Sequence, residues 1–543
     1  MHFPDLFEKL LSARNIGSDE KETFLNPDYA GLHNPLLMPD MERARDRIIE
    51  AMEKKEHIVV YSDYDADGIP GAVVLSDFFK RAKYENVSFY IPHRHDEGFG
   101  LNIDALEECL TRGTKLLITI DCGTADIKEV KHISEKGVDV IITDHHEQKE
   151  ILPPAFAVVN PKRKDSKYPY KDLCGSGVAF KLVQAILEKE RFGIKEGMEK
   201  WSLDMVAIAT LSDMVPLRGE NRILARYGLE VLRKSPRPGL LALFKNLRMN
   251  QKYLTEDDIA FMITPRINAA SRMGTPEDAF KLLATTDPVE AEALAAHLEE
   301  INNKRKVLVA SVVKDAKRHL KEREIKKVIV IGNPEWRPAL LGLVANSLVE
   351  DYDRPVFVWG RDGDGVLKGS CRSNGKVNLH SLMSRAGESF IEYGGHSQAG
   401  GFSATLENIS LLEDALSEAY PETDDHDVRL AGDPLEINIE DVCEDLWKTV
   451  SLFSPFGMDN EKPIFKINAE VKGVKQFGKA KEHLEVVFNC PKRDVKAVGF
   501  FTSSDKYTVP VETGSKVSLL AHMEKSYFMN RPELRLRIVD ITA

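Results

Sequence analysis

Cysteine pairs, long apolar runs and an excess of basic residues are all missing from this 543-residue chain. Its six cysteines are scattered and form no CxxC pair, which argues against both a disulfide framework and a zinc site built from thiolates. No stretch of about eighteen uncharged apolar residues could span a bilayer, and the N-terminus lacks the basic and apolar segments of a secretory signal. We therefore expect a cytoplasmic protein with buried, reduced thiols and no membrane association.

The shortage of basic charge bears on which partners the chain can bind. Its 74 Lys and Arg residues against 86 Asp and Glu give a net charge of −12, whereas contacts with phosphates need Lys and Arg. That objection weakens if several carboxylates hold cations, because bound metals and a local basic groove reverse the field that a polyanion meets. A metal-dependent enzyme acting on nucleic acid is therefore compatible with the charge balance.

The length of the chain exceeds what one hydrophobic core usually organises, and its composition, 43% hydrophobic and 29% charged, is that of a globular protein. Between residues 41 and 190, apolar strands alternate with amphipathic helices, which is the rhythm of a parallel α/β sheet. A helical stretch over 287–324 is long enough to bridge two domains. A second, smaller α/β unit follows it, and after 463 the period changes to that of a small β-barrel.

We therefore predict an α/β protein built of consecutive parts, with a polar run over 421–427 marking a linker. The parts are an N-terminal arm over 1–45, a parallel-sheet domain over 46–285, a long bridging helix over 286–325, a smaller α/β domain over 326–420, a linker and return segment over 421–462, and a β-barrel over 463–543.

Acidic residues follow three of the predicted strands at the point where each strand ends. The motif Asp63-Tyr-Asp-Ala-Asp-Gly68 follows the first of these strands, Asp121 follows the second, and Asp144-His-His146 follows the third. Because the functional crevice of an open parallel sheet lies beyond the carboxyl ends of its strands, we expect these side chains to converge. Carboxylates that converge in a partly buried crevice repel one another unless protons or cations compensate them.

Each of these features also has a simpler explanation when it is taken alone. The 63–68 motif suits a solvated acidic turn, or a calcium loop that would lack its usual glutamate because Val74 stands at the twelfth position. A histidine pair is often structural, and so is an acid at the end of a helical run, such as Asp213. Taken together, carboxylates with one or two imidazoles favour Mn²⁺ or Mg²⁺, and two such ions would clamp a phosphoryl displacement.

Ten different short motifs follow one another along nearly the whole chain. They are Asp63-Tyr-Asp-Ala-Asp-Gly68, Glu97-Gly-Phe-Gly-Leu-Asn102, Asp121-Cys-Gly123, Thr143-Asp-His-His-Glu147, Val159-Asn-Pro161, Gly175-Ser-Gly-Val-Ala179, Ser212-Asp213, Arg266-Ile-Asn-Ala-Ala270, Gly369-Ser-Cys-Arg-Ser373 and Gly394-Gly-His396. In this order they resemble the DHH phosphoesterase superfamily and, within it, the family of bacterial RecJ single-strand-specific exonucleases. Two segments depart from the family pattern: Ser271 stands where glycine often follows Asn-Ala-Ala, and Trp336-Arg-Pro-Ala339 replaces Trp-His-Pro-Gly.

The resemblance implies a parallel-sheet DHH domain, a DHH-associated domain and a C-terminal OB-fold. It implies a 5′-to-3′ exonuclease that releases 5′-mononucleotides from single-stranded DNA by two-metal hydrolysis with Mn²⁺ or Mg²⁺, in DNA repair and recombination. A single-strand-binding protein and a helicase are the implied partners, and we expect a monomer. The implied catalytic residues are Asp65, Asp67, Asp121, His145, His146 and Asp213, and these together with Asp63 are the implied metal ligands.

Further residues are implied as substrate contacts, namely Arg94, Phe99, Arg266, Asn268, Ser370, Arg372, Ser373 and His396. The Ser370–Ser373 segment resembles a phosphate pocket that would anchor the 5′ end together with Arg94, because guanidinium and hydroxyl donors match a terminal phosphate. Phe99 would stack on the terminal base, although a buried Phe in a glycine-rich turn would look the same. For Arg266 and Asn268 the alternative is hydrogen bonding between domains.

The predicted β-barrel contains two segments, 472–481 and 525–531, that interleave cations with aromatic residues. Grooves that bind single strands have this composition, and a solvated charged face can have it too. Two other functions stay open. The first is an enzyme of the same superfamily that cleaves oligonucleotides or a small phosphoanhydride, but such an enzyme does not need a bridging helix and a barrel. The second is a non-catalytic relative that binds DNA, but such a protein does not need an intact set of acidic residues.

Overall fold

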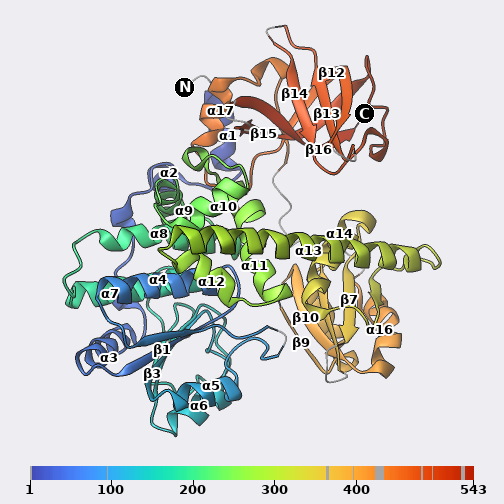
Figure 1. The fold of residues 1–543 in the computed structure, drawn as a ribbon. Helices are drawn as coiled ribbons and strands as arrows, with labels where there is room; N and C mark the ends of the chain where they lie inside the picture. Colours follow the sequence, from blue (N-terminus) through green and yellow to red (C-terminus); the bar gives the residue numbers. More distant parts are fainter. Residues whose placement is uncertain are drawn as a thin grey trace. The chain divides into compact units, whose positions relative to one another are not determined.

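The computed structural model describes residues 3–94, 96–361, 366–395, 397–421, 433–478, 481–491, 493–527 and 532–542. It divides into two compact units. The first unit comprises Met1–Ser271, Thr275–Leu298 and Ala431–Ala543, and the second comprises Arg272–Gly274 and Glu299–Leu430. The first unit contains a parallel sheet and a β-barrel, and the second contains a mixed sheet (Figure 1).

The first sheet has the strand order β2-β1-β3-β4-β5 and is parallel throughout. Its strands are β1 (His57–Ser62), β2 (Val87–Tyr90), β3 (Thr114–Ile120), β4 (Asp139–Thr143) and β5 (Ala157–Val159). Both faces of β1 and β3 are buried, which explains why their sequences are continuous apolar runs. The strand order reverses between β1 and β3, so a crevice opens at their carboxyl ends. The predicted parallel α/β sheet is confirmed.

Helices cover both faces of this sheet (Figure 1). On one face, α5 (Ile103–Thr111) and α6 (Ile127–Ser134) bury Leu106 and Ile133 against Val59, Leu117 and Val140 of the strands. On the other face lie α3 (Met41–Glu53), α4 (Gly68–Arg81) and α7 (Gly175–Lys189). Because α4 starts directly after the acidic motif at the end of β1, the sheet and its helices fix where that motif lies.

A run of helices completes this part of the chain. It consists of α8 (Leu203–Ser212), α9 (Gly219–Leu232), α10 (Pro238–Asn246), the π-helix η5 (Asp258–Ile263), α11 (Thr264–Met273) and α12 (Glu277–Ala284). The predicted bridging helix is α13 (Pro288–Leu320), with 33 residues, which begins in the first unit and ends in the second. None of the described helices, α13 included, combines the length and apolar content needed to cross a bilayer.

The second unit is built on a mixed sheet of order β6-β7-β8-β10-β9, in which only β6 and β7 pair in parallel. Its strands are β6 (Ile329–Gly332), β7 (Val356–Arg361), β8 (Leu367–Arg372), β9 (Glu392–Gly395) and β10 (Ala399–Ala404). The end of α13 and α14 (Pro338–Tyr352) cover one face, and α15 (Leu379–Arg385) and α16 (Leu406–Ala419) cover the other. The smaller α/β fold predicted here is confirmed.

A five-stranded barrel forms the C-terminal part of the first unit. Its strands are β12 (Phe465–Phe477), β13 (His483–Phe488), β14 (Val495–Gly499), β15 (Lys516–Ser526) and β16 (Glu533–Thr542). They follow the order β12-β13-β14-β16-β15, and pairing of β15 with β12 closes the barrel. Alternate residues such as Phe465, Ile467 and Leu519 point into its core, which is the pattern that predicted a barrel. This closed five-stranded barrel agrees with the predicted OB-fold.

The N-terminal arm packs on this barrel region. Helices α1 (Pro4–Ser12) and α2 (Ser18–Leu25) share one hydrophobic core with the barrel and with α17 (Glu444–Ser451), and α1 lies beside α17 and β15 in Figure 1. The ring of Phe7 meets that of Phe453 edge to face, 5.5 Å away. The predicted linker and return segment thus contains α17 and the short strand β11 (Leu435–Glu436) in its described part.

One buried arginine joins these distant parts of the first unit. Arg222 on α9 is 1% exposed and donates hydrogen bonds to the carbonyl oxygens of Phe24, Phe453 and Ser454. Its guanidinium also lies 3.7 Å from the centre of the Phe24 ring. A buried cation satisfied mainly by carbonyls leaves several acceptors unpaired when it is removed.

We therefore predict that Arg222→Met lowers the free energy of unfolding by about 2–4 kcal/mol, because the freed carbonyls stay buried. The measurement is urea unfolding followed by circular dichroism. The matched control is Arg112→Met, whose arginine is exposed and pairs only with Glu108, so its change is expected to stay below about 1 kcal/mol. Equal losses in the two variants would contradict a joining role for Arg222.

Candidate metal centre

Seven side chains with metal-binding atoms meet at the carboxyl ends of β1, β3 and β4. The loop after β1 supplies three aspartates, β3 ends at Asp121, the loop after β4 supplies two histidines, and Asp213 caps the C-terminus of α8. Their ligand atoms form three groups, each within 4.8 Å: Asp121, His145 and His146; Asp67, His145 and Asp213; and Asp63, Asp65 and Asp121. The structure thus brings together every residue that the sequence suggested as a ligand.

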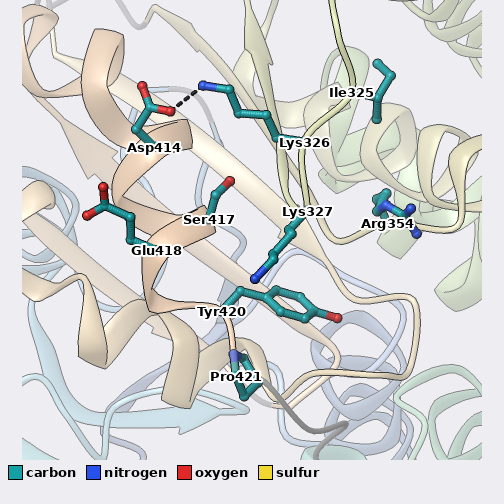
Figure 2. A pocket seen from close by; sticks show the side chains of 9 residues that line it. All are labelled: Ile325, Lys326, Lys327, Arg354, Asp414, Ser417, Glu418, Tyr420 and Pro421. Atoms are coloured by element: carbon teal, nitrogen blue, oxygen red, sulfur yellow. Dashed lines mark hydrogen bonds and ion pairs between the residues drawn. The ribbon is translucent and has the colours of Figure 1, made fainter.

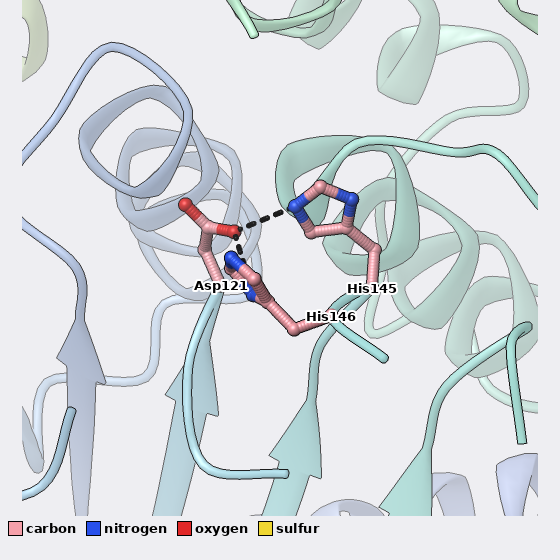
Figure 3. A group of neighbouring side chains, drawn as sticks. All are labelled: Asp121, His145 and His146. Carbon is pink, nitrogen blue, oxygen red and sulfur yellow. Dashed lines mark ion pairs between the residues drawn. The ribbon is translucent and has the colours of Figure 1, made fainter. Parts of the chain in front are cut away.

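Asp121 and His145 link the three groups. The Nε2 atom of His145 lies 3.1 Å from Asp121 Oδ1, 3.6 Å from Asp213 Oδ2 and 3.7 Å from Asp67 Oδ2. The Nδ1 atom of His146 lies 3.9 Å from the same Asp121 oxygen, and Figure 3 shows both imidazole rings beside that carboxylate at the end of its strand. Because Asp121 and His145 each belong to two of these groups, the set would hold more than one divalent cation, which would supply Lewis-acid chemistry.

The backbone hydrogen bonds between neighbouring strands continue for one residue beyond the end of each strand. They fix the positions of the aspartates that follow the strands. The Asp63 N–H donates to Ile120 O at 3.0 Å, the Asp121 N–H to Thr143 O at 2.9 Å, and the Asp144 N–H to Val159 O at 3.1 Å. Asp121 then turns away with a positive φ of 62°. Neighbouring strand ends are thereby tied to one another, which explains why their side chains converge.

The N-terminus of α7 holds Asp67. Its two carboxylate oxygens accept hydrogen bonds from the N–H groups of Gly175 at 2.6 Å and Ser176 at 2.7 Å. A Cβ atom at Gly175 would lie 2.6 Å from Asp121 Cβ, so only glycine allows the helix to approach this closely. The sequence singled out the Gly175 motif but gave it no role, and its role is to support two of the ligands.

The carboxylates of this site would repel one another if all were ionised, so their negative charge must be compensated. Burial, followed by neighbouring carboxylates, raises the pKa of Asp63, Asp121 and Asp213, and raises that of Asp67 to about 6. Asp63 Oδ1 and Asp121 Oδ1 are buried and accept no hydrogen bond from any described residue. Unsatisfied carboxylate oxygens that share a crevice with imidazoles fit hard divalent cations such as Mn²⁺ or Mg²⁺.

Asp144 organises the histidine pair and was not among the predicted site residues. Its Oδ1 accepts from the His145 N–H at 2.7 Å and lies 2.8 Å from His146 Nδ1, while Oδ2 accepts from the Thr124 N–H at 2.9 Å. Burial opposes ionisation of Asp144, but the contact with His146 outweighs burial and lowers the Asp144 pKa. In the sequence, the position of Asp144 directly before the two histidines is the feature that could have indicated this role.

The two histidines are held in different states of charge. Burial and then the charge of His146 lower the pKa of His145 to about 3, so its imidazole is neutral and free to act as a ligand. Burial also acts to lower the pKa of His146, but the hydrogen bond and charge of Asp144 outweigh it and raise the pKa to about 9. With Nδ1 bonded to Asp144, His146 presents Nε2 as an N–H donor towards an anionic group, and it must release that proton before Nε2 can bind a cation.

Phe99 lies at the mouth of the site. It is 56% exposed, and its ring centre is 5.5 Å from that of His146. Gly98 and Gly100 on either side have φ angles of 81° and 86°. The loop is fixed by the Leu101 N–H, which donates to Asp126 Oδ2 at 2.8 Å. Phe99 is therefore exposed beside His146 rather than buried in its turn, and Asp126 is a support that the sequence did not reveal.

Two of the other predicted substrate contacts of the first unit, Arg94 and Asn268, border the acidic loop. The Arg94 guanidinium lies 5.0 Å from the centre of the Tyr64 ring. Asn268 Oδ1 accepts a hydrogen bond from the Ala66 N–H at 2.9 Å, so its amide holds the loop that bears the aspartates. Arg266 is buried and donates to Met262 O at 2.9 Å.

The remaining predicted contacts lie in the second unit, at the end of β8. The Arg372 guanidinium packs over Gly342, where a Cβ atom would come within 2.8 Å of Nη2, and burial lowers the Arg372 pKa. No carboxylate of the described residues forms an ion pair with Arg372, and its Nη1 donates to Cys371 O at 2.8 Å. The Ser373 hydroxyl donates to Val377 O at 2.7 Å. The predicted contact His396 lies outside the described residues.

Comparison with known proteins places this geometry in a family. The chain matches the DHH family N-terminal domain over residues 57–210, the DHHA1 domain over 325–421 and the RecJ OB domain over 435–540. It is 34% identical over 546 residues to the single-stranded-DNA-specific exonuclease RecJ of Bacillus subtilis, covering 99% of this chain and 68% of that protein. With RecJ of Thermus thermophilus the identity is 31% over 489 residues, covering 88% and 69%.

Solved structures agree with this assignment. The crystal structure of Thermus thermophilus RecJ in complex with Mn²⁺ matches with a TM-score of 0.79 and 27% identity, covering 98% of this chain and 75% of that one. The structure of the same protein in complex with Mg²⁺ has the same fold, with a TM-score of 0.72, 24% identity, and coverage of 99% and 76%. On its sequence identity over nearly the whole chain and on the match of all three domains, the chain belongs to the RecJ family of single-stranded-DNA-specific exonucleases.

Proposed function

We propose that this protein is a metal-dependent exonuclease that removes 5′-mononucleotides from the 5′ end of single-stranded DNA. The observation that carries the proposal is the convergence of seven metal-binding side chains, in three overlapping groups, at the carboxyl end of the parallel sheet of a RecJ-family chain. The relatives named above are single-stranded-DNA-specific exonucleases, and one of them has been solved with Mn²⁺ and with Mg²⁺.

We assign the metal ligands to Asp63, Asp65, Asp67, Asp121, His145, His146 and Asp213. Oxygen-rich ligands with imidazoles suit Mn²⁺ or Mg²⁺, and the unsatisfied oxygens of Asp63 and Asp121 support this fit. When bound, two such ions supply Lewis-acid chemistry for the displacement at phosphorus and compensate the carboxylates. No protein nucleophile is then required.

The chain's own side chains orient the reacting groups. The Gly175 and Ser176 N–H groups fix Asp67, and Asp144 fixes the ring of His146 through Nδ1. His146 Nε2 then faces the substrate or a cation in a set orientation. Phe99, exposed beside His146, is suited to stack on a base next to the scissile phosphate.

Phosphate contacts come from arginine and hydroxyl donors. Ser370, Arg372 and Ser373 of the second unit are proposed to bind the 5′-terminal phosphate, because a guanidinium matches its geometry, and Arg94 of the first unit is proposed as a substrate contact. Arg266 and Asn268 are proposed as further substrate contacts, with Asn268 also holding the acidic loop. His396, from the Gly-Gly-His motif, is proposed to touch the phosphate of the scissile nucleotide.

On the barrel, the residues suited to stack on DNA differ from those that the sequence highlighted. Lys472 pairs with Asp494, Lys525 pairs with Glu444, and Tyr527 stacks on Tyr253 with ring centres 4.0 Å apart. Phe500 and Phe501 are 39% and 77% exposed, however, and the guanidinium of Arg537 lies 5.6 Å from the Phe500 ring centre. The guanidinium of Arg535 lies 5.7 Å from the same ring and also pairs with Glu524. We propose that this aromatic and basic face contacts the strand.

The cellular setting is proposed from the family alone. We propose a monomer in the cytoplasm that works in DNA repair and recombination with a single-strand-binding protein and a helicase. The family membership of the chain supports this setting, and the absence of a membrane-spanning helix among the described residues is compatible with it.

For the proposed function, the first prediction concerns substrate and polarity. With Mn²⁺ and a 5′-labelled single strand, we expect labelled mononucleotide from the earliest time points, because cleavage starts at that end. A 3′-labelled strand shortens stepwise instead, and a blunt duplex, a dinucleotide and pyrophosphate react more slowly. The products are resolved by gel electrophoresis and thin-layer chromatography.

Early mononucleotide from the 3′ label would contradict the polarity. Faster cleavage of the dinucleotide or of pyrophosphate would instead indicate a DHH enzyme for small substrates. No metal-dependent cleavage of any of these would indicate a relative that binds DNA without cutting it.

The second prediction concerns the residue shared between metal groups. We expect Asp121→Asn to lose Mn²⁺ binding, measured by titration with electron paramagnetic resonance, and to lower kcat by about 10²- to 10⁴-fold, because one ligand of each cation is weakened. Asp104→Asn, at an exposed aspartate on α5, is the matched control and should change neither quantity. An unchanged Mn²⁺ stoichiometry in Asp121→Asn would argue against Asp121 as a shared ligand.

The third prediction concerns the aromatic residue at the mouth of the site. We expect Phe99→Ala to raise KM for single-stranded DNA by about 5- to 100-fold with a smaller effect on kcat, because a stacked base contributes about 1–3 kcal/mol. Phe99→Trp preserves the aromatic face and should restore KM. Steady-state kinetics on a fluorescent oligonucleotide tests both, and a loss in the tryptophan variant as large as in the alanine variant would rule out stacking.

A further inference from the structure

A long groove runs along the surface of the second unit between α13 and α14. It has a volume of about 1160 Å³ and is lined by residues of α13 between Arg305 and Arg318, by Lys321 just after that helix, and by Trp336, Leu343 and Ser347. None of the proposed metal ligands or phosphate contacts lines it. The groove is therefore a separate surface whose use is not explained by the nuclease site.

The floor of the groove is aliphatic and its ends are cationic. Arg305, Val309, Val313 and Lys317 recur every four residues and so lie along one ridge of the helix. Val309 and Val313 are half-buried where the ridge packs towards the core under α14. An apolar strip in the middle of the ridge is thus bounded by cations at both ends.

The charge of the groove is opposite to that of the whole protein. Six cations line it, namely Arg305, Lys306, Lys314, Lys317, Arg318 and Lys321, and Asp315 is the one carboxylate in its lining. Lys317 pairs with Asp351 and Arg318 with Asp315, so part of this charge is balanced. In a chain with a net charge of −12 this is a concentrated positive surface, which favours an anionic occupant.

A second pocket of the same unit offers a useful contrast. It has a volume of about 610 Å³, and Figure 2 shows that it is lined by Lys326 and Lys327 on one side and by Asp414 and Glu418 of α16 on the other. Lys326 already pairs with Asp414. Because both signs of charge are present there, that pocket favours no particular class of ligand, whereas the groove does.

Two anionic occupants must be distinguished, a nucleic acid strand and an acidic protein segment. Grooves for single strands expose aromatic rings on which bases stack. Here the one aromatic lining residue, Trp336, is only 5% exposed and belongs to the core, so it offers no stacking face. The aliphatic strip instead matches the apolar face of an amphipathic helix, whose acidic face would meet the cations.

We propose that the groove between α13 and α14 binds an acidic amphipathic helix of a partner protein. The apolar side chains of that helix rest on Val309, Val313 and Leu343, and its Asp and Glu residues face the cations at the two ends of the groove. The proposal goes beyond nuclease activity, since binding here requires no metal ligand.

The experiment uses the full chain and a fluorescent 18-residue helical peptide with Leu on one face and Glu on the other, read by fluorescence anisotropy. A peptide with Gln in place of Glu and an oligothymidine strand are the comparison probes. We expect the Glu peptide to bind, the Gln peptide to bind at least about 10-fold more weakly, and Lys314→Glu to weaken the Glu peptide about 10-fold, because a like charge then faces it.

Lys304→Glu is the matched control, since Lys304 is on the same helix but outside the groove lining and pairs with Glu300. It should change peptide affinity less than about 2-fold. The rate of single-strand cleavage should be the same in Lys314→Glu as in the unmodified protein, so a failure of the nuclease proposal would be seen independently.

The proposal would be overturned if the Glu peptide fails to bind, or if it binds equally well to Lys314→Glu. Equal binding of the Gln peptide would overturn the acidic character of the partner. A loss of oligothymidine binding or of cleavage in Lys314→Glu, without a loss of peptide binding, would identify the groove as a wall for DNA instead.

Discussion

The mutual repulsion of carboxylates at the carboxyl ends of parallel strands is the constraint on which the catalytic part of this protein depends. Asp63, Asp67 and Asp121 are buried and Asp213 lies half-buried beside them, and each has a raised pKa as a consequence of desolvation and of its neighbours. Such a set is stable only if cations or protons are bound to it. The requirement for compensating cations or protons is therefore a property of the folded state itself, and it does not arise only when the substrate reacts.

The surrounding fold holds these side chains where repulsion would otherwise push them apart. The strand ladder extends to the backbone of Asp63, Asp121 and Asp144, and the start of α7 points its N–H groups at Asp67. A glycine at position 175 lets that helix come close to Asp121. The rigidity of sheet and helix thus preserves the ligand geometry before any ion arrives.

The parts of this arrangement that follow periodic rules could be predicted from the sequence. Buried parallel strands are continuous apolar runs, and the residues after them must meet at one edge, so the set from Asp63 to His146 was visible without a structure. The glycine-rich strands β8 to β10 could not be predicted from the sequence, because glycine has no preference for strands. Supports such as Asp126 act through a hydrogen bond to a loop whose path the sequence does not show. In the barrel, the lysines at 472 and 525 looked available, but their pairing with Asp494 and Glu444 depends on neighbours across strands.

The shared core of the N-terminal arm and the barrel has a consequence for biosynthesis. Leu6, Phe7 and Leu10 leave the ribosome hundreds of residues before the barrel strands that cover them in the finished core. Domains generally fold in the order in which they are made, and exposed apolar surface invites aggregation meanwhile. The parallel-sheet domain can be complete while the apolar face of this helix is still uncovered, so that face stays exposed until the barrel strands have been made.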